Sequence, residues 1–318
     1  ISGSTVIHDS QDVQVSGVVT ATSFHGDASQ LTNLPAAGSS LEATASGTLS
    51  DGSTVLVNTD GTVSAVGLEA FGWIETLSGT GDDRGRGIAV DSSGNFYVIG
   101  QSDSTGAGND DFLIAKYDTS GTIQWQRTLG GTSFDMGYGI AVDSSGNVYV
   151  TGRAASAGEG SMDILIAKYN TSGTIQWQRT LGGTDTEFGG AIAVDSSGNV
   201  YVGGSTRSTG AGSYDFLIAK YNTSGTIQWQ RTLGGTDRDE GNGIAVDSSG
   251  NVYITGRCES AGAGSMDFLI AKYDTSGTIQ WQRTLGGTNI DFSHAIAVDS
   301  SGNVYVLGYT GVPGIGEE

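Results

Sequence analysis

Carboxylates, arginines and aromatic rings are the residues of this chain whose types could do chemistry, and they recur at a regular spacing. Acids and arginines gather just before short runs that read Gly-Ile-Ala-Val or Ala-Ile-Ala-Val. Two well-placed carboxylates could hydrolyse a glycosidic bond, with one as acid and the other as base or nucleophile. Rings beside carboxylates could instead hold a sugar or a protein surface by packing and hydrogen bonding.

The pattern argues against catalysis. The Gly-Ile-Ala-Val runs contain no acid before Asp91 and its equivalents, and repeated copies of one acid do not provide distinct acid and base roles. His8, His25 and His294 lack the spacing of a metal site, and Asp-Ser-Ser-Gly-Asn lacks the distal Glu of a calcium loop. The single cysteine, Cys258, excludes a disulfide within the chain. We therefore expect no enzyme activity, no metal and no cofactor.

An internal repeat must position these side chains. The tryptophans Trp73, Trp125, Trp177, Trp229 and Trp281 are spaced 52 residues apart. The segment Ala-Val-Asp-Ser-Ser-Gly-Asn keeps the same step, starting at Ala89, Ala141, Ala193, Ala245 and Ala297. A fixed period of this length is typical of propellers and other repeat folds.

Each unit contains four strand-like runs separated by turn residues. In the second copy they are Gly139–Val142, Val148–Gly152, Ile164–Tyr169 and Thr174–Leu181. The turns Asp143–Asn147 and Asn170–Gly173 carry Asx and Gly at positions that need side-chain caps or positive φ. A four-stranded antiparallel unit is a propeller blade, so we predict an all-β, five-bladed β-propeller.

The last blade is incomplete in the sequence, with only two strands in residues 295–308. Val57–Val63 aligns with Tyr117–Ile123, so we expect residues 54–77 to supply the missing outer strands and close the ring. This divides the chain into an N-terminal attachment or oligomerisation segment with its linker, residues 1–42, and a propeller, residues 43–318.

Two resemblances to known families follow from these motifs. Residues 73–310 resemble SBBP-type bacterial β-propeller repeats through Ala-Val-Asp-Ser-Ser-Gly-Asn and Leu-Ile-Ala-Lys-Tyr. Residues 1–66, through the stretches 18–35 and 43–66, resemble segments of phage tail-fibre and virion structural proteins. The first resemblance implies the fold, and the second implies a virion role. Residues 1–35 contain few large apolar side chains, so we expect them to pack in a homo-oligomer.

Comparison of the copies separates two faces of the predicted propeller. The copies differ in the links between blades and in the connection between the second and third strands, which emerge on the same face of an up-and-down blade. We call this the variable face and predict that it binds a ligand or partner, because loops on a rigid scaffold usually do so. The candidate binding residues are Asp82, Asp83, Arg84, Phe134, Asp135, Tyr138, Glu187, Phe188, Arg207, Tyr214, Arg238, Asp239, Glu240 and Phe292.

Charge narrows the choice of partner. The net charge of −20 repels nucleic acid and anionic membranes, and no run of 18 apolar residues predicts membrane insertion. Our leading hypothesis is a virion-associated structural protein, a fibre or surface appendage, whose variable face contacts the host surface, a cell-surface glycan or another virion or surface protein. The alternative is a secreted or cell-surface bacterial lectin-like propeller, and a glycoside hydrolase is least favoured. The expected location is the virion or the extracellular space.

Overall fold

The computed structural model describes residues 54–57, 63–66, 77 and 79–311, and these form strands and turns without a helix. Contacts divide the chain into two compact units, Ile1–Ile74 and Glu75–Glu318. In the first unit, β1 (Thr54–Val57) pairs with β2 (Val63–Val66) in an antiparallel hairpin. Within the described residues there is no helix that could cross a membrane. The predicted boundary after residue 42 lies outside the described residues.

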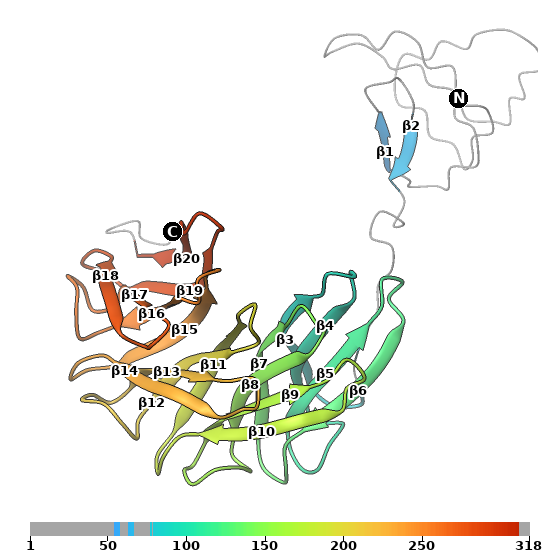
Figure 1. Cartoon of the computed structure of the whole chain (residues 1–318), viewed down its shortest axis with the longest axis horizontal. Helices are drawn as coiled ribbons and strands as arrows, with labels where there is room; N and C mark the ends of the chain where they lie inside the picture. The colour runs from blue at the N-terminus through green and yellow to red at the C-terminus, as the bar shows by residue number, and fades with distance from the viewer. Residues whose placement is uncertain (1–53, 58–62, 67–76, 78, 312–318) are drawn as a thin grey trace, which may run out of the picture. The chain divides into compact units, whose positions relative to one another are not determined.

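The second unit contains four four-stranded antiparallel sheets and one two-stranded sheet, which follow one another in chain order (Figure 1). The first strands are β3 (Asp83–Val90), β7 (Asp135–Val142), β11 (Glu187–Val194), β15 (Asp239–Val246) and β19 (Asp291–Val298). The second strands are β4 (Phe96–Ser102), β8 (Val148–Ala154), β12 (Val200–Thr206), β16 (Val252–Cys258) and β20 (Val304–Thr310).

Only the first four sheets have outer strands among the described residues. The third strands are β5 (Asp111–Tyr117), β9 (Asp163–Tyr169), β13 (Asp215–Tyr221) and β17 (Asp267–Tyr273). The fourth strands are β6 (Ile123–Leu129), β10 (Ile175–Leu181), β14 (Ile227–Leu233) and β18 (Ile279–Leu285). The first strands of successive sheets lie against one another and therefore form the inner side of the row. The predicted four-stranded repeat is confirmed.

The two hairpins of each sheet have the predicted turn chemistry. Asp143 Oδ1 accepts hydrogen bonds from the backbone N–H groups of Ser145 and Asn147, each at 2.9 Å. Its Oδ2 accepts from the Asn147 side chain and from the Tyr149 hydroxyl. Gly146 has a φ of 77°, which favours glycine. Asn170 caps the second hairpin in the same way.

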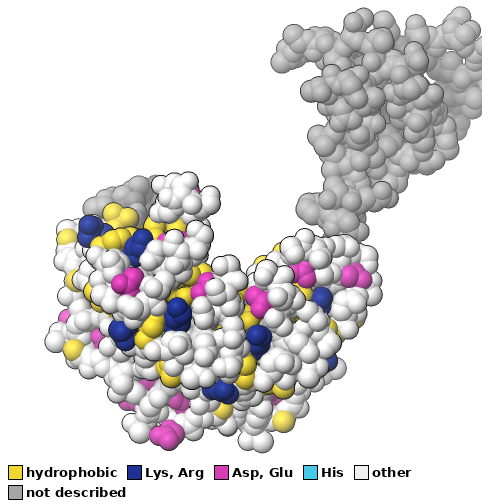
Figure 2. Space-filling model, in the orientation of Figure 1, with side chains coloured by type: hydrophobic (Ala, Val, Ile, Leu, Met, Phe, Trp, Pro, Cys, Tyr) yellow, Lys and Arg dark blue, Asp and Glu magenta, His cyan; other side chains and the backbone are white. Residues whose placement is uncertain are grey.

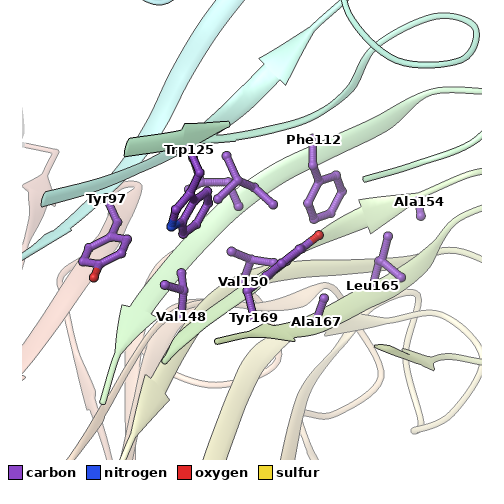
Figure 3. Packing of buried hydrophobic residues seen from close by; sticks show 11 residues of the cluster. Tyr97, Phe112, Trp125, Val148, Val150, Ala154, Leu165, Ala167 and Tyr169 are labelled. Atoms are coloured by element: carbon purple, nitrogen blue, oxygen red, sulfur yellow. The ribbon is translucent and has the colours of Figure 1, made fainter. Parts of the chain in front are cut away.

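The core lies between sheets rather than within one. Tyr97, Ile99 and Phe112 of the first sheet are fully or almost fully buried against Val148 and Val150 of the second (Figure 3). Equivalent clusters occupy the next two junctions. Each side chain of this size stabilises the fold by roughly 1.5–3 kcal/mol when it leaves water, so the junctions hold the row of sheets together.

A polar clamp joins the outer edges of neighbouring sheets. Trp125 Nε1 donates to the carbonyl oxygen of Thr171 at 3.1 Å, and Arg127 Nε donates to that of Gly173 at 2.7 Å. A Cβ on Gly173 would lie within 3 Å of the Trp125 ring. The same bonds recur from Trp177 and Arg179 and from Trp229 and Arg231 to the following sheet. The outer hairpin thus has a nearly identical sequence in the four complete copies, with Asp or Asn at its first turn position, because it receives the preceding sheet.

The inner strands are longer than the sequence suggested. The sequence predicts a first strand that begins at Gly139, but β7 begins at Asp135 and pairs along its whole length with β8. The register shifts between Gly137 and Gly139, so a β-bulge accommodates Tyr138 as an extra residue. The variable residues 135–138 were mistaken for a loop because the bulge interrupts the alternation that marks a strand.

The predicted closure of the ring is wrong. Among the described residues, β1 pairs only with β2, and β20 pairs only with β19. Both ends of the row leave apolar side chains exposed: Ile88 by 67% and Leu307 by 68%, whereas Ile192 and Ile99, their equivalents inside the row, are 9% and 1% exposed.

The reason lies in the hairpin itself. Val57 lies opposite Val63, as Tyr117 lies opposite Ile123, so the turn matches that of an outer hairpin. However, its strands have four described residues where outer strands have seven, and Val63–Val66 contains neither the Trp nor the Arg of the clamp; residues 58–62 and 67–76 of the predicted closing segment lie outside the described residues.

Candidate functional site

The variable face is formed by the N-terminal halves of the first strands and the C-terminal halves of the second strands that pair with them. Each inner strand has the same bulge, which adds Arg86, Tyr138, Gly190, Asn242 or His294 at this end. Bulges redirect side chains out of the regular alternation of a strand. The differing residues of the five sheets are therefore brought together along the inner side of the row.

Arginines and rings alternate across the first three sheets. The Arg86 guanidinium lies 5.3 Å from the centre of the Tyr138 ring. Arg153 lies 5.8 Å from the same ring and 5.3 Å from that of Phe188, which in turn is 5.8 Å from Tyr214. Cation–π contacts at such distances contribute about 0.5–2 kcal/mol each, so the side chains hold one another in place.

The alternation continues into the last two sheets. Arg207 and Arg238 both lie over the Tyr214 ring, at 5.3 and 5.0 Å. Glu240 pairs with Arg238 and with Arg257, and Arg257 lies 5.3 Å from the Phe292 ring. We call this series the arginine–aromatic ladder; it consists of Arg86, Tyr138, Arg153, Phe188, Arg207, Tyr214, Arg238, Glu240, Arg257 and Phe292.

The ladder brings most of the non-repeated arginines together on one face of an acidic molecule. The chain has 14 Lys and Arg residues against 34 Asp and Glu. Eight of the 14 repeat once per sheet, at Lys116 and Arg127 and their equivalents. In Figure 2 the Lys and Arg side chains lie as separate spots along the row of sheets. Every other cation lies on the variable face: Arg84, Arg86, Arg153, Arg207, Arg238 and Arg257.

Three of the predicted binding residues, Asp135, Glu187 and Asp239, are fully buried. Asp135 accepts hydrogen bonds from the Gly131 N–H at 2.7 Å and from the Ser156 hydroxyl at 2.5 Å. These carboxylates hold the links between sheets and do not reach a ligand at the surface. Asp83 begins β3 in the equivalent position and accepts from the Gly79 N–H and the Ser104 hydroxyl.

Each of these buried carboxylates lies close to a second one from the preceding sheet. One oxygen of Asp215 and one of Asp239 both lie within 3 Å of the point that a Cβ on Gly234 would occupy. Burial, together with the charge of Asp239, raises the pKa of Asp215 above its ordinary value. Burial also opposes ionisation of Asp239, but hydrogen bonds from Cys258 and Ser260 hold its pKa below the ordinary value. One member of the pair thus favours the proton and the other the charge.

A small open pocket lies where the first two sheets meet on the variable face. Its lining includes Arg84, Gln101, Asp110, Phe134 and Met136. The Phe134 ring is 48% exposed there. Asp82 also lines the pocket and lies 3.9 Å from Arg84 in an exposed ion pair, which contributes little to stability. No group of three His, Cys, Asp or Glu that could hold a metal ion occurs in the part of the chain that the structure describes.

The predicted site residues thus fall into three groups. Seven belong to the ladder: Tyr138, Phe188, Arg207, Tyr214, Arg238, Glu240 and Phe292. Asp82, Arg84 and Phe134 line the pocket, whereas Asp83, Asp135, Glu187 and Asp239 hold links.

Sequence reasoning missed Arg153, Arg257 and Met136 as site residues. The signal was present, because Gln101, Arg153, Ser205, Arg257 and Tyr309 occupy one repeat position directly after a constant glycine.

The opposite, constant face has a structural explanation. Its hairpins carry the Asx turns and receive the Trp–Arg clamps, so their sequences are fixed by packing. The variable face lacks this constraint except at its buried carboxylates. Difference between the copies is therefore permitted at the ladder positions, and what the ladder residues do follows from their own chemistry.

Family models identify the repeat. The model described as "Beta-propeller repeat", SBBP, matches residues 72–106, 124–157, 176–210, 228–257 and 280–314, which together exceed half of the chain. The chain belongs to the SBBP β-propeller repeat family. A model for a β-propeller domain of unknown function also matches residues 196–227 of this SBBP protein. The sequence-based resemblance for residues 73–310 is thereby confirmed, whereas these two models do not extend into residues 1–66 and the phage-like resemblance stays a prediction.

Curated relatives match only in part. The regulatory protein FlaEY of Caulobacter vibrioides is 27% identical over 188 residues, covering 48% of the SBBP chain and 20% of the relative. An uncharacterised WD repeat-containing protein of Acanthamoeba polyphaga mimivirus is 24% identical over 220 residues, covering 61% of the SBBP chain and 14% of the relative. The chain therefore spans a fifth or less of the length of these relatives.

Solved structures are similar at low identity. A Bacteroides caccae protein of unknown function has a TM-score of 0.47 and 12% identity, covering 81% of the SBBP chain and 80% of its own. A gluconolactonase from Xanthomonas campestris has a TM-score of 0.41 and 15% identity, covering 70% and 69%. Similarities at this level assign no activity to the SBBP chain.

Proposed function

We propose that this SBBP propeller is a binding protein and not an enzyme, and that the arginine–aromatic ladder on its variable face holds the ligand. One observation carries the proposal. Every arginine outside the repeated positions lies on this face; five of these six lie over aromatic rings, and four of the five over a ring from a neighbouring sheet. Rigid rings and guanidinium groups of this kind are the residues that dominate binding interfaces.

The buried carboxylates support binding over catalysis. A glycosidase needs two acids that reach the substrate from an open site. Here Asp135, Glu187 and Asp239 are fully buried and bonded to backbone N–H groups, so they cannot meet a substrate. Along the inner strands, the stretch after each bulge carries only small and aliphatic residues, as in Gly139–Val142.

The setting we propose is a virion fibre or surface appendage, in which residues 1–66 attach the propeller and the ladder faces outward. Its support is the resemblance of that segment to tail-fibre and virion proteins. A secreted lectin-like propeller is the second candidate, favoured by the exposed Phe134 ring beside carboxylates in the pocket. Both settings use the same binding face.

Binding of the full chain to an immobilised glycan array and to whole bacterial envelopes tests the ladder. We expect the wild-type chain to bind at least one of these probes. The double variant Phe188→Ala, Tyr214→Ala should lose that binding. The matched control is Ile175→Ala, since Ile175 is 44% exposed on an outer strand away from the ladder. Melting curves establish that both variants fold. Binding by the folded double variant at the wild-type level, or no binding to any probe, would contradict the proposal.

A further inference from the structure

We propose that Arg153, on the variable face of the second sheet, is the centre of a subsite for a sugar that carries a single carboxylate. The inference rests on the proposed function, because the subsite is part of the ladder. It goes further by naming the class of ligand and the atom that recognises its charge.

Arg153 differs from its equivalent two sheets later, Arg257, in the partner that it meets. Arg257 occupies the same position in β16 and pairs with Glu240, at 2.5 Å. In β7 the residue equivalent to Glu240 is Met136, so Arg153 meets a thioether instead of a carboxylate. Its terminal nitrogen lies 3.0 Å from the Met136 sulfur, a weak acceptor. Among the described residues no carboxylate pairs with Arg153.

The Arg153 guanidinium has unused hydrogen-bonding capacity. Nε of Arg153 is buried and has no hydrogen-bond acceptor. Nε of Arg257 is also unpaired, but its guanidinium already has a carboxylate partner in Glu240. What differs between the two guanidinium groups is the charge partner, and hydrogen bonds from a guanidinium to a carboxylate are about twice as strong as neutral ones. A ligand carboxylate at Arg153 would therefore provide what Glu240 provides to Arg257.

The surroundings of Arg153 favour a sugar as the carrier of that carboxylate. The Tyr138 ring lies between Arg86 and Arg153. The exposed Phe134 ring and Met136 both line the pocket between the first two sheets, and the Met136 sulfur lies beside Arg153. Aromatic rings pack against the C–H faces of sugars. Arg86 donates to Gln101, and Gln101 donates to Asp110, so polar groups of fixed orientation are available for hydroxyl groups.

The charges of the pocket select against other anions. Asp82, Asp103 and Asp110 line it, and carboxylates accept hydrogen bonds from hydroxyl groups but repel further carboxylates. The net charge of −20 repels polyanions as a whole. An acidic peptide with several carboxylates therefore fits worse than a sugar with one carboxylate and many hydroxyls.

The test compares the methyl glycosides of galacturonic acid and galactose, which differ at one carboxylate, by NMR titration of the full chain. We expect wild-type protein to bind the acid more tightly by roughly tenfold or more, the change that one charge-assisted pair gives. Arg153→Gln should remove this preference. Equal affinity for both glycosides, no binding of the acid, or equally tight binding of an acidic hexapeptide would overturn the proposal.

Two exchanges between sheets make the test specific. Met136→Glu copies the Glu240 arrangement and should occupy Arg153 internally, so the acid should lose its advantage while the melting temperature is maintained. Glu240→Met copies the Met136 arrangement and should create a second site, doubling the stoichiometry for the acid. Unchanged acid binding in folded Met136→Glu protein would overturn the role of Arg153. Glycan binding that depends on Phe188 and Tyr214 but not on the carboxylate would leave the ladder as the binding face and reject only the subsite.

Discussion

At the scale of single residues, the junctions depend on carboxyl groups with opposite preferences. The hairpin aspartates, such as Asp195, are held ionised by hydrogen bonds from Asn199 and Tyr201, and their pKa lies below the ordinary value although burial opposes this. Asp163 and Asp215 are buried beside a second carboxylate, and their pKa values lie above it. Acid therefore weakens one set of contacts and strengthens the other.

The variant Asp215→Asn should be more stable than wild type at pH 7, by about 0.5–1 kcal/mol. An asparagine can donate to Asp239 while its oxygen still accepts from the Gly212 N–H, which bonds Asp215 at 3.1 Å. Since the folded-state pKa of Asp215 is raised, its contribution to stability falls as pH rises through that pKa.

Urea unfolding at pH 7 and at pH 4 checks this, and the advantage of the variant should shrink at the lower pH. A variant that is less stable than wild type at pH 7 would show that Asp215 is needed as a carboxylate.

The variant Asp195→Ala should lose about 2 kcal/mol of stability at pH 7, because four donors lose their acceptor: two N–H groups, the Asn199 amide and the Tyr201 hydroxyl. The folded-state pKa of Asp195 is lowered, so its contribution is present above the ordinary value of 3.8 and is lost as pH falls through the folded pKa. Unfolding curves from pH 7 to pH 2 should converge for variant and wild type. A difference that stays constant with pH would contradict the ionised cap.

The hairpin aspartates could be predicted from sequence, but the buried acids of the links could not be placed correctly. The turn residues Asp143 and Gly146 have one local explanation, which the sequence alone supplies. Asp135 is buried by the preceding sheet, and its partner Asp111 is distant in sequence. That repeat position is acidic in all five sheets, a regularity that marks a structural role more than a binding one.

At the scale of elements, the outer hairpin and the preceding outer strand form one device. The hairpin presents its backbone carbonyls, and the strand presents a Trp and an Arg to them. The last outer strand, β18, has the same residues, but the sheet that follows has no outer hairpin among the described residues. Trp281 and Trp177 therefore form a natural comparison between an engaged and an unengaged clamp.

Replacing Trp177 with Phe should lower the free energy of unfolding by about 1–2 kcal/mol, because the bond to Thr223 is lost and the ring becomes smaller. Replacing Trp281 with Phe should cost clearly less. Chemical denaturation of both variants measures the difference. Equal losses would mean that Trp281 is engaged as Trp177 is.

The lengths of the outer strands could be predicted from the alternation of residues such as Ile175, Trp177 and Leu181. The lengths of the inner strands could not. At Tyr138 a bulge shifts the alternation by one residue, so the pattern on its N-terminal side no longer predicts a strand. A bulge depends on pairing with a neighbouring strand, which no local pattern specifies. The ladder was hidden for the same reason, since its rings meet only across sheets.

At the scale of the whole propeller unit, the first and last sheets expose apolar side chains whose equivalents pack at the junctions inside the row. Ile88 and Val90 at the first sheet are exposed where Ile140 and Val142 pack on the preceding sheet. Tyr305 and Leu307 at the last sheet are exposed where Tyr97 and Ile99 are buried. The number of repeats could be predicted from the sequence. Closure of the ring could not, because it depends on contacts between segments that share no repeat sequence.

Supplying the missing outer hairpin should stabilise the unit. Thr310 corresponds to Cys258, so replacing residues 312–318 with a copy of residues 260–286 continues the repeat in register. The copied hairpin would pair with β20 and accept from Trp281 and Arg283, and the melting temperature should rise by on the order of 5 °C.

The control is the same extension with valine in place of the copied Gly277. A Cβ on Gly277 lies within 3 Å of the Trp229 ring, so this tail should not dock on Trp281. Calorimetry of both extended chains decides, and equal melting temperatures would contradict completion of the sheet.

Near-identity of the four outer hairpins also has a consequence for how the chain reaches its fold. Since Thr-Ser-Gly-Thr-Ile-Gln-Trp-Gln-Arg occurs four times, a hairpin that meets the wrong neighbour during folding finds the same clamp as at the right one. Repeat proteins are prone to such misassembly. What distinguishes one junction from another lies at the inner strands, where Arg257 packs on Phe292 of the next sheet and Arg153 on Phe188. The variable ladder residues thus favour the correct order of the sheets. Refolding should be slower and more heterogeneous in a variant whose ladder residues are the same in every sheet.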